Sequence, residues 1–129
     1  MKRVIAVLSI SALFLTGCGN GGGSVTNLNS AGFADVIKDK SVILVDVRTP
    51  LEFASGHIQG ATNIDWESGH FESDIKALDM TKKYAVYCRS GNRSNQAVSL
   101  MSADGFRTVY NLKRGILDWT LNGLPTVTQ

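Results

Sequence analysis

The amino-acid sequence predicts an α/β domain in which helices flank a parallel β-sheet. Two continuous apolar, β-prone runs, at residues 42–47 and 84–87, are typical of strands that are buried on both faces of such a sheet. Segments with helical spacing of apolar residues separate these runs from each other and from a third run at 107–111. Because strands that alternate with helices usually connect in parallel, the pattern favours one open sheet.

The first half of the chain contains residues that typically start helices. Asn29 and Ser30 can cap a helix that runs to about Lys40, because their side chains accept hydrogen bonds from the first helical N–H groups. After the first strand, Pro50 suits the first position of a short helix that reaches Ala54.

The second half contains a longer helix behind the strand at 84–87. From Ser94 onward apolar residues recur at helical spacing, and Gly105 stands where the end of a helix favours glycine. Four shorter segments complete the expected order: a strand at 63–64, a helix at 72–78, a strand at 107–111 and a helix at 115–121.

Length and charge limit the classes of protein to which the chain can belong. Its 129 residues are enough for one small domain and not for two. Lys and Arg number 13 and Asp and Glu number 11, but without Lys2 and Arg3, which lie in an expected leader, both totals are 11. Since no basic stripe or patch is visible, we expect no nucleic-acid partner.

The first 17 residues are typical of a secretory signal. A basic start at 1–3 precedes a mostly apolar stretch at 4–15, which is too short to span a bilayer. The sequence LTGC at 15–18 resembles a bacterial lipobox, and the alternative is an ordinary signal peptide with a chance cysteine. The lipobox resemblance implies a lipoprotein signal peptide at 1–17, cleavage before Cys18 and lipidation of Cys18. Several acyl chains would hold the protein stably at a membrane.

The residues after the lipobox have the composition of a linker. Residues 18–28 are rich in Gly, Asn and Ser, which predicts a flexible tether between the lipid and a folded domain at 29–126. Residue 19 is Gly rather than the Asp that often retains Gram-negative lipoproteins at the inner membrane. We therefore expect a location in the cell envelope outside the cytoplasm, at the periplasmic face of the outer membrane in a Gram-negative host.

The most reactive group expected in the domain is the thiol of Cys88. Cys88 ends the second apolar run and opens the segment 88–94, CRSGNRS, which leads into a helix. In a strand–loop–helix arrangement, backbone N–H groups and the positive end of the helix dipole face the thiol. Together with Arg89 and Arg93, they should lower its pKa and make it nucleophilic. With Cys18 lipidated, Cys88 has neither a disulfide partner nor a resolving cysteine.

Four motifs in the right order resemble those of the rhodaneses, a family of sulfurtransferases, over roughly residues 29–125. The motifs are Asp46-Val47-Arg48 with Glu52 and Phe53, the sequence GHIQGA at 56–61 with Asn63-Ile64, the Cys88 segment, and Gly115 with Trp119, Gly123 and Pro125. The resemblance implies a rhodanese-like fold with about five parallel strands flanked by helices. It also implies an active-site loop that begins at the cysteine after a central strand.

The same resemblance implies that Cys88 takes up a sulfane sulfur and becomes a persulfide. The expected loop residues, whose backbone N–H groups would hold that sulfur, are Arg89, Ser90, Gly91, Asn92 and Arg93. Related phosphatases and arsenate reductases use a Cys-x5-Arg loop, whereas four residues separate Cys88 from Arg93 in this chain. The tighter loop favours a single sulfur atom over a tetrahedral phosphate or arsenate.

The predicted function is therefore that of a thiosulfate-type sulfurtransferase without a metal or other cofactor. The Cys88 thiolate would attack the outer sulfur of thiosulfate or another sulfane-sulfur donor, and sulfite would leave. Cyanide, a small thiol or a protein thiol would then accept the sulfur in a ping-pong scheme. Arg89 or Arg93 would attract the anionic donor. The alternative is a low-turnover module of the cell envelope that carries sulfane sulfur or binds a partner.

Three further polar residues admit a catalytic or a structural interpretation. Asp46 and Arg48 lie at the end of the first strand, and the ligand edge of an open α/β sheet lies beyond the carboxyl ends of its strands. They should therefore share an edge with Cys88. We favour a supporting role for both, because buried charged groups usually find partners. For His57 we favour a structural hydrogen bond in a turn over a role as general base.

Overall fold

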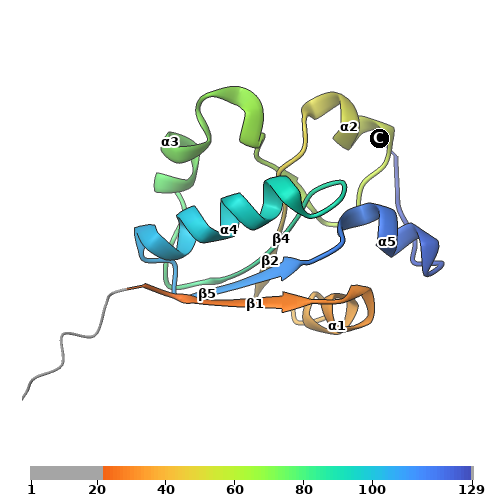
Figure 1. Ribbon diagram of the computed structural model, residues 1–129, viewed down its shortest axis with the longest axis horizontal. Coiled ribbons are helices and arrows are strands. Elements are labelled where there is room, and N and C mark those ends of the chain that lie inside the picture. The colour runs from red at the N-terminus through yellow and green to blue at the C-terminus, as the bar shows by residue number, and fades with distance from the viewer. Residues whose placement is uncertain (1–21, 129) are drawn as a thin grey trace, which may run out of the picture.

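The computed structural model describes residues 22–128 and contains one five-stranded sheet in which all paired strands run parallel (Figure 1). The spatial order is β1-β5-β4-β2-β3. The strands are β1 (Ser24–Leu28), β2 (Val42–Asp46), β3 (Thr62–Asn63), β4 (Lys83–Tyr87) and β5 (Thr108–Leu112). The predicted α/β fold with a five-stranded parallel sheet is confirmed.

Helices cover both faces of this sheet (Figure 1). They are α1 (Ser30–Val36), α2 (Pro50–Ser55), the 3-10 turn η1 (Trp66–Ser68), α3 (Phe71–Lys76), α4 (Asn92–Asp104) and α5 (Gly115–Leu121). Helices α3 and α4 pack on one face through Phe71, Ile75 and Met101. Helices α1 and α5 pack on the other face through Phe33 and Trp119.

Strand β4 lies at the centre of the sheet and contributes to both cores. Tyr84, Val86 and Cys88 belong to the core under α3 and α4, whereas Ala85 and Tyr87 belong to the core under α1 and α5. This alternation follows from the two-residue period of a strand. Cys88 therefore leaves the sheet from a strand that is paired on both edges and buried on both faces.

Residues 24–28 form a strand, which corrects the prediction of a flexible tether over 18–28. β1 pairs in parallel with β5, and the side chain of Asn27 accepts a hydrogen bond from that of Asn111 at 2.9 Å. β1 is an edge strand, and most of its side chains are exposed. Its composition is therefore as polar as that of a linker, and only its pairing with β5 shows that the segment is a strand. The folded domain thus begins before residue 29.

The domain also extends past residue 126, its predicted end. Val127 and His57 form an antiparallel bridge, in which each backbone N–H donates to the carbonyl of the other, at 2.8 and 2.9 Å. The C-terminal segment accordingly lies beside α2 (Figure 1).

The first helix starts as predicted and ends earlier. The side chain of Asn29 caps α1 by accepting a hydrogen bond from the N–H of Gly32 at 2.8 Å. The helix ends at Val36 rather than near residue 40, because Asp39 accepts hydrogen bonds from the backbone N–H and hydroxyl of Ser41 and forms a turn before β2.

The predicted signal peptide and Cys18 lie outside the described residues. Of the helices formed by residues 22–128, none combines the length and the apolar character that a membrane crossing requires.

Candidate active site

The thiol of Cys88 lies in a cradle formed by the loop after β4 and the start of α4. Helix α4 begins at Asn92, two residues earlier than predicted, so only residues 89–91 turn the chain between strand and helix. The backbone N–H of Gly91 donates to Sγ at 3.1 Å, and Oγ of Ser94 lies 3.4 Å from Sγ. Cys88 is only 1% exposed, so these contacts replace water around the sulfur.

The cradle favours the thiolate in spite of this burial. Burial raises the pKa of Cys88, but hydrogen bonds from the Ser94 hydroxyl and from the backbone N–H groups of Ser94, Gly91 and Ser90 outweigh it. The net pKa of the thiol lies below its ordinary value. Hydrogen bonds are therefore the main reason why the thiolate is favoured, because they stabilise the charged sulfur more than the neutral thiol.

Ser94 is the one contact of Sγ that the sequence interpretation did not assign to the site. It is fully buried, and its hydroxyl lies 3.2 Å from the carbonyl oxygen of Gly91 as well as 3.4 Å from Sγ. When Cys88 is a thiol, its S–H donates to Ser94, whose own O–H donates to Gly91. When Cys88 is a thiolate, the rotatable O–H of Ser94 can donate to Sγ instead.

Replacing Ser94 by Ala is expected to raise the pKa of Cys88 by about one unit, because a hydrogen bond to a charged group contributes about 1.5 kcal/mol or more. The measurement is the rate of iodoacetamide alkylation at Cys88 against pH, with the site assigned by peptide mass. Since only the thiolate reacts, the midpoint should move to higher pH. Ser99→Ala is the control, because Ser99 is exposed on the same helix and bonds to the Asn95 carbonyl. An unchanged midpoint in Ser94→Ala would contradict the assignment.

Two glycines allow the backbone to close tightly around the loop. Gly91 has φ of 105°, and a Cβ there would lie 2.0 Å from the carbonyl oxygen of Lys113. Gly115 has φ of 68°, and a Cβ there would lie 2.2 Å from the carbonyl oxygen of Arg89. Both positions therefore require glycine for conformation and for space. The close approach lets the start of α5 hold the loop, since the N–H of Ile116 donates to the Cys88 carbonyl at 2.9 Å.

Arg93 is held in an ion pair at the edge of the loop. Its guanidinium donates to both carboxylate oxygens of Glu52 on α2, at 2.8 and 2.9 Å, and to Glu67 at 3.3 Å. Hydrogen bonding to Glu52 raises the pKa of Arg93, and the charge of Cys88 adds to the increase. The pair thus connects α2 to the start of α4 and neutralises a charge that we expected to attract the donor.

The Glu52–Arg93 pair predicts an acid-sensitive contribution to stability. Hydrogen bonding from Arg93 is the main cause that lowers the pKa of Glu52 from its ordinary value of 4.5 to about 2. Because the folded-state pKa is depressed, the stabilisation is present above the unfolded pKa and is lost as the pH falls towards the folded pKa. The difference in unfolding free energy between wild type and Glu52→Gln should therefore be constant above about pH 5.5 and shrink towards pH 2. Urea denaturation at several pH values measures this difference in unfolding free energy. A difference that does not change with pH would contradict the assignment of the lowered Glu52 pKa to its pairing with Arg93.

Asp46 and Arg48 form a buried brace at the same sheet edge. Asp46 is the last residue of β2, fully buried, and accepts hydrogen bonds from Nε and Nη2 of Arg48 at 3.0 and 2.6 Å. Arg48 Nη2 also donates to the carbonyl of Gly56 at 2.7 Å. These contacts support the structural interpretation, because the two charges neutralise each other and Arg48 also holds the segment that follows α2.

His57 is likewise engaged in structural contacts. It is buried, its Nδ1 lies 2.9 Å from the carbonyl oxygen of Phe53, and its ring stacks on that of Phe53 with centroids 3.8 Å apart. The hydrogen bond in the turn that we favoured over a catalytic role is therefore present.

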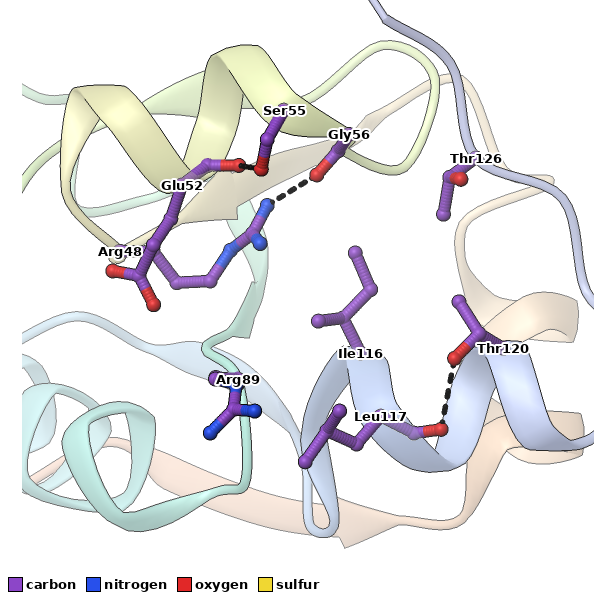
Figure 2. Close-up of a pocket in the computed structure, with 9 residues that line it drawn as sticks. All are labelled: Arg48, Glu52, Ser55, Gly56, Arg89, Ile116, Leu117, Thr120 and Thr126. Atoms are coloured by element: carbon purple, nitrogen blue, oxygen red, sulfur yellow. Dashed lines mark hydrogen bonds between the residues drawn. The ribbon is translucent and has the colours of Figure 1, made fainter.

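A pocket of about 280 Å³ opens beside the loop, between α2 and α5 (Figure 2). Arg48 and Glu52 lie at one side of it, and Ile116 and Leu117 of α5 lie at the other. Arg89, the residue after Cys88, also lines it. The remaining lining residues are Ser55, Gly56, Thr120 and Thr126. The pocket therefore combines the side chain of Arg89 with an apolar wall on α5, and Cys88 itself is not among its lining residues.

The structure brings most of the predicted site residues together around the loop, but they do not share one role. Gly91 and Asn92 open α4, Arg89 and Ser90 are exposed in the loop, and Arg93 is half-buried against Glu52. Glu52 entered the sequence interpretation only as part of a motif. Because Arg93 lies 41 positions further along the chain, no local pattern predicts this pair.

Comparison with known proteins identifies the family to which the domain belongs. The family model for the rhodanese-like domain matches residues 30–122. A sulfurtransferase of Allochromatium vinosum is 34% identical over 104 residues, which cover 80% of this chain and 95% of the relative. The thiosulfate sulfurtransferase GlpE of Pseudomonas fluorescens is 33% identical over 87 residues, with coverage of 67% and 77%. A tRNA uridine(34) hydroxylase of Buchnera aphidicola is 35% identical over 104 residues, and the match spans only 33% of its length.

Solved structures give the same result. A rhodanese-related protein from Thermoplasma volcanium superposes with a TM-score of 0.72 at 34% identity, covering 81% of this chain and 99% of its own. The range matched by the family model, residues 30–122, contains strands β2 to β5, the helices and the cysteine loop, but not β1. The chain therefore belongs to the rhodanese-like domain family and is a rhodanese-like sulfurtransferase.

Proposed function

We propose that this protein transfers the outer sulfur of thiosulfate through a persulfide on Cys88 to a thiol or to cyanide. The observation that carries the proposal is the contact of Gly91 N–H and Ser94 Oγ with a buried Sγ whose pKa is lowered. The similarity to a thiosulfate sulfurtransferase supports the choice of donor.

The reaction has two half-reactions that meet at the same sulfur atom. In the first, the Cys88 thiolate attacks the outer sulfur of thiosulfate, an S–S bond to Sγ forms, and sulfite leaves with the electron pair of the broken S–S bond. In the second, the acceptor attacks the outer sulfur of the persulfide, and the electron pair of the Sγ–S bond returns to Cys88. Cyanide gives thiocyanate, and a thiolate gives a new persulfide. This is a ping-pong scheme with a covalent intermediate.

The small cradle suits the persulfide better than an oxyanion. The backbone N–H of Gly91 donates to Sγ, and hydrogen bonds from the backbone of Ser90 and Ser94 also lower the pKa of Cys88. Each charge-assisted hydrogen bond to a sulfur anion lowers its free energy in a buried site. Gly115 and α5 fix the loop from behind, so the donors are held in place before the reaction.

The test is thiocyanate formation by purified protein supplied with thiosulfate and cyanide. Protein exposed to thiosulfate alone should gain about 32 Da, the mass of one sulfur atom, on the peptide that contains Cys88. If neither thiocyanate nor the mass gain is observed, the proposal fails. Hydrolysis of an aryl phosphate in their place would indicate phosphatase chemistry instead.

The burial of Cys88 supports a second candidate function, that of a sulfur carrier with little turnover. A sulfur enclosed by the loop is protected from small nucleophiles and is released when a partner opens or contacts the loop. The two functions differ in one measurement. A carrier forms the persulfide stoichiometrically but discharges it to cyanide far more slowly than it loads.

We also propose that the domain is anchored to a membrane of the cell envelope by lipid on Cys18. The LTGC sequence at 15–18, after an apolar stretch, supports this proposal. In a bacterial host, the wild-type chain should fractionate with membranes and carry acyl chains on residue 18. Cys18→Ser should not. An unmodified Cys18 on the mature wild-type protein would contradict the proposal.

A further inference from the structure

The cysteine loop lies at the end of the sheet opposite to the one at which β1 begins (Figure 1). Because all paired strands are parallel, each strand enters the sheet at the same end, here called the amino end, and leaves it at the carboxyl end. Strand β1 enters at Ser24, whereas Cys88 follows the carboxyl end of β4. The start of the domain and the reactive sulfur are therefore separated by the length of the sheet.

The described chain is already fixed to the amino end of the sheet at Gly23. The N–H of Gly23 donates to the carbonyl of Ser102 at 3.2 Å, and the hydroxyl of Ser102 donates to the carbonyl of Gly23 at 2.7 Å. A Cβ at this position would clash with the carbonyl of Phe106, so the close approach requires glycine. These contacts place the entry of the chain beside the last turns of α4.

The tether that remains between the proposed lipid and the domain is short. Residues 19–21 alone separate Cys18 from Gly22, the first residue that the structure describes. Even at full extension, the Cα atoms of Cys18 and Gly22 are at most about 14 Å apart. The tether therefore limits how far the domain can turn relative to a membrane that holds Cys18.

The reactive sulfur lies further from Gly22 than this tether reaches. Extension of the register of β1 and β4 on β5 places Gly22 level with position 106 and Cys88 level with position 113. At about 3.3 Å per residue, these seven positions correspond to roughly 23 Å along the strands. A tether of about 14 Å is too short to bring a lipid-bound Cys18 level with the cysteine loop.

Exposed apolar side chains would by themselves turn the cysteine loop towards the bilayer. Leu51 on α2 and Leu117 and Leu121 on α5 are 83%, 42% and 85% exposed. Both helices lie at the carboxyl end of the sheet (Figure 1), and burial of leucines in hydrocarbon is favourable. In that orientation the amino end would point away from the membrane. The short tether excludes it, because Cys18 would then leave the bilayer.

We propose that the anchored domain holds its cysteine loop away from the bilayer, so that the molecules that load and unload sulfur arrive from the aqueous phase. The surface on which they act is the carboxyl end of the sheet, formed by the cysteine loop, α2 and α5. A thiol at the level of the lipid headgroups does not reach the sulfur. This inference rests on the proposed anchor at Cys18, and the class of partner rests also on the proposed sulfur transfer.

Labels at the two ends of β5 measure the orientation. Arg107 and Lys113 are exposed cations that flank this strand at its amino and carboxyl ends. The variants Arg107→Cys and Lys113→Cys, each combined with Cys88→Ser, are labelled with a fluorophore. The full lipoprotein is then reconstituted into phosphatidylcholine vesicles that contain a rhodamine-labelled lipid. Energy transfer should be stronger from position 107, because the two positions differ by about 20 Å along the strand. Equal transfer, or stronger transfer from position 113, would overturn the inference.

A second measurement identifies the thiols that reach the sulfur. Lipoprotein in vesicles is loaded with thiosulfate and freed of donor by gel filtration. It then receives phosphatidylthioethanol, whose thiol lies on a phospholipid headgroup, or glycerophosphothioethanol, the same headgroup without acyl chains. In each case the thiolate attacks the outer sulfur of the Cys88 persulfide, the Sγ–S bond breaks and its electron pair stays on Sγ. The loss of about 32 Da from the protein gives the rate.

A longer tether supplies the matched variant. An insert of about twenty Gly and Ser residues between Gly21 and Gly22 spans about 25 Å on average, which is comparable to the distance to the cysteine loop. It should raise the rate with the lipid-borne thiol by about tenfold or more and leave the rate with the soluble headgroup unchanged. The same insert appended after Gln129 should change neither rate. A wild type that reacts with the lipid-borne thiol as fast as the long-tether variant would overturn the inference.

Failure of the anchor and failure of sulfur transfer give different results. Lipoprotein that does not float with the vesicles contradicts the anchor at Cys18. Protein that floats but gains no mass from thiosulfate contradicts the proposed sulfur transfer. The energy transfer requires neither thiosulfate nor the Cys88 thiol, so it tests the orientation even when no persulfide forms.

Discussion

Cys88→Ser is expected to reduce thiosulfate-dependent turnover by at least about a thousandfold, because it removes the atom on which the proposed persulfide forms. A serine hydroxyl is similar in shape but is not ionised at neutral pH and does not form a persulfide. The measurements are the rate of thiocyanate formation and the mass of the protein after exposure to thiosulfate. The variant should show no gain of about 32 Da.

The fold of this variant provides the control. Cys88 packs in the core under α3 and α4, and a serine hydroxyl at this position is expected to bond to the same two partners, Gly91 and Ser94. The thermal unfolding midpoint should therefore remain close to that of the wild type. Turnover within tenfold of the wild type in a folded Cys88→Ser variant would show that the reaction does not proceed through this residue.

Asp46→Asn is expected to destabilise the fold by about 3 to 5 kcal/mol, the effect of breaking a buried ion pair on one side. Asp46 is fully buried and Arg48 is 5% exposed, so the guanidinium would be left with its charge and only part of its hydrogen bonding. Since small domains have unfolding free energies of about 5 to 15 kcal/mol, this is a large share of the total. Guanidinium chloride denaturation measures the loss.

Two further variants separate the buried charge from other effects of this substitution. Asp46→Asn combined with Arg48→Met should recover part of the loss, because no unpaired charge then remains in the interior. Asp35→Asn removes a carboxylate from the exposed Asp35–Lys38 pair and should change stability little. If Asp46→Asn lowers the unfolding free energy no more than Asp35→Asn does, the stabilising role of the Asp46–Arg48 pair is contradicted.

The elements that could be predicted are those with a strong local pattern. The runs at 42–47 and 84–87 became β2 and β4 with ends shifted by one residue, since fully buried parallel strands are continuously apolar. Strand β1 could not be predicted in this way. Its exposed edge position favours polar side chains, and its partner β5 lies about 80 residues further along the chain.

The site likewise has features that a local sequence pattern predicts and features that it does not. The thiol at the end of a central strand, the glycine turn and the helix start are neighbours in sequence, so the N–H cradle around Cys88 could be predicted. Which of the three arginines form ion pairs could not be predicted. Arg48, Arg89 and Arg93 look alike in the sequence, and only their distances to Asp46 and Glu52 show that two are paired.

The sequence by itself determined the class of fold, the order of most elements and the place of Cys88 at the end of a central strand. These properties depend on periodicity, capping and turn residues within a few positions of one another. The tertiary structure alone decided where the domain begins, which hydrogen bonds lower the pKa of the thiol, and which cation faces the pocket. Each of these depends on groups from distant segments meeting at short range, where hydrogen bonds and charge pairing set the free energy.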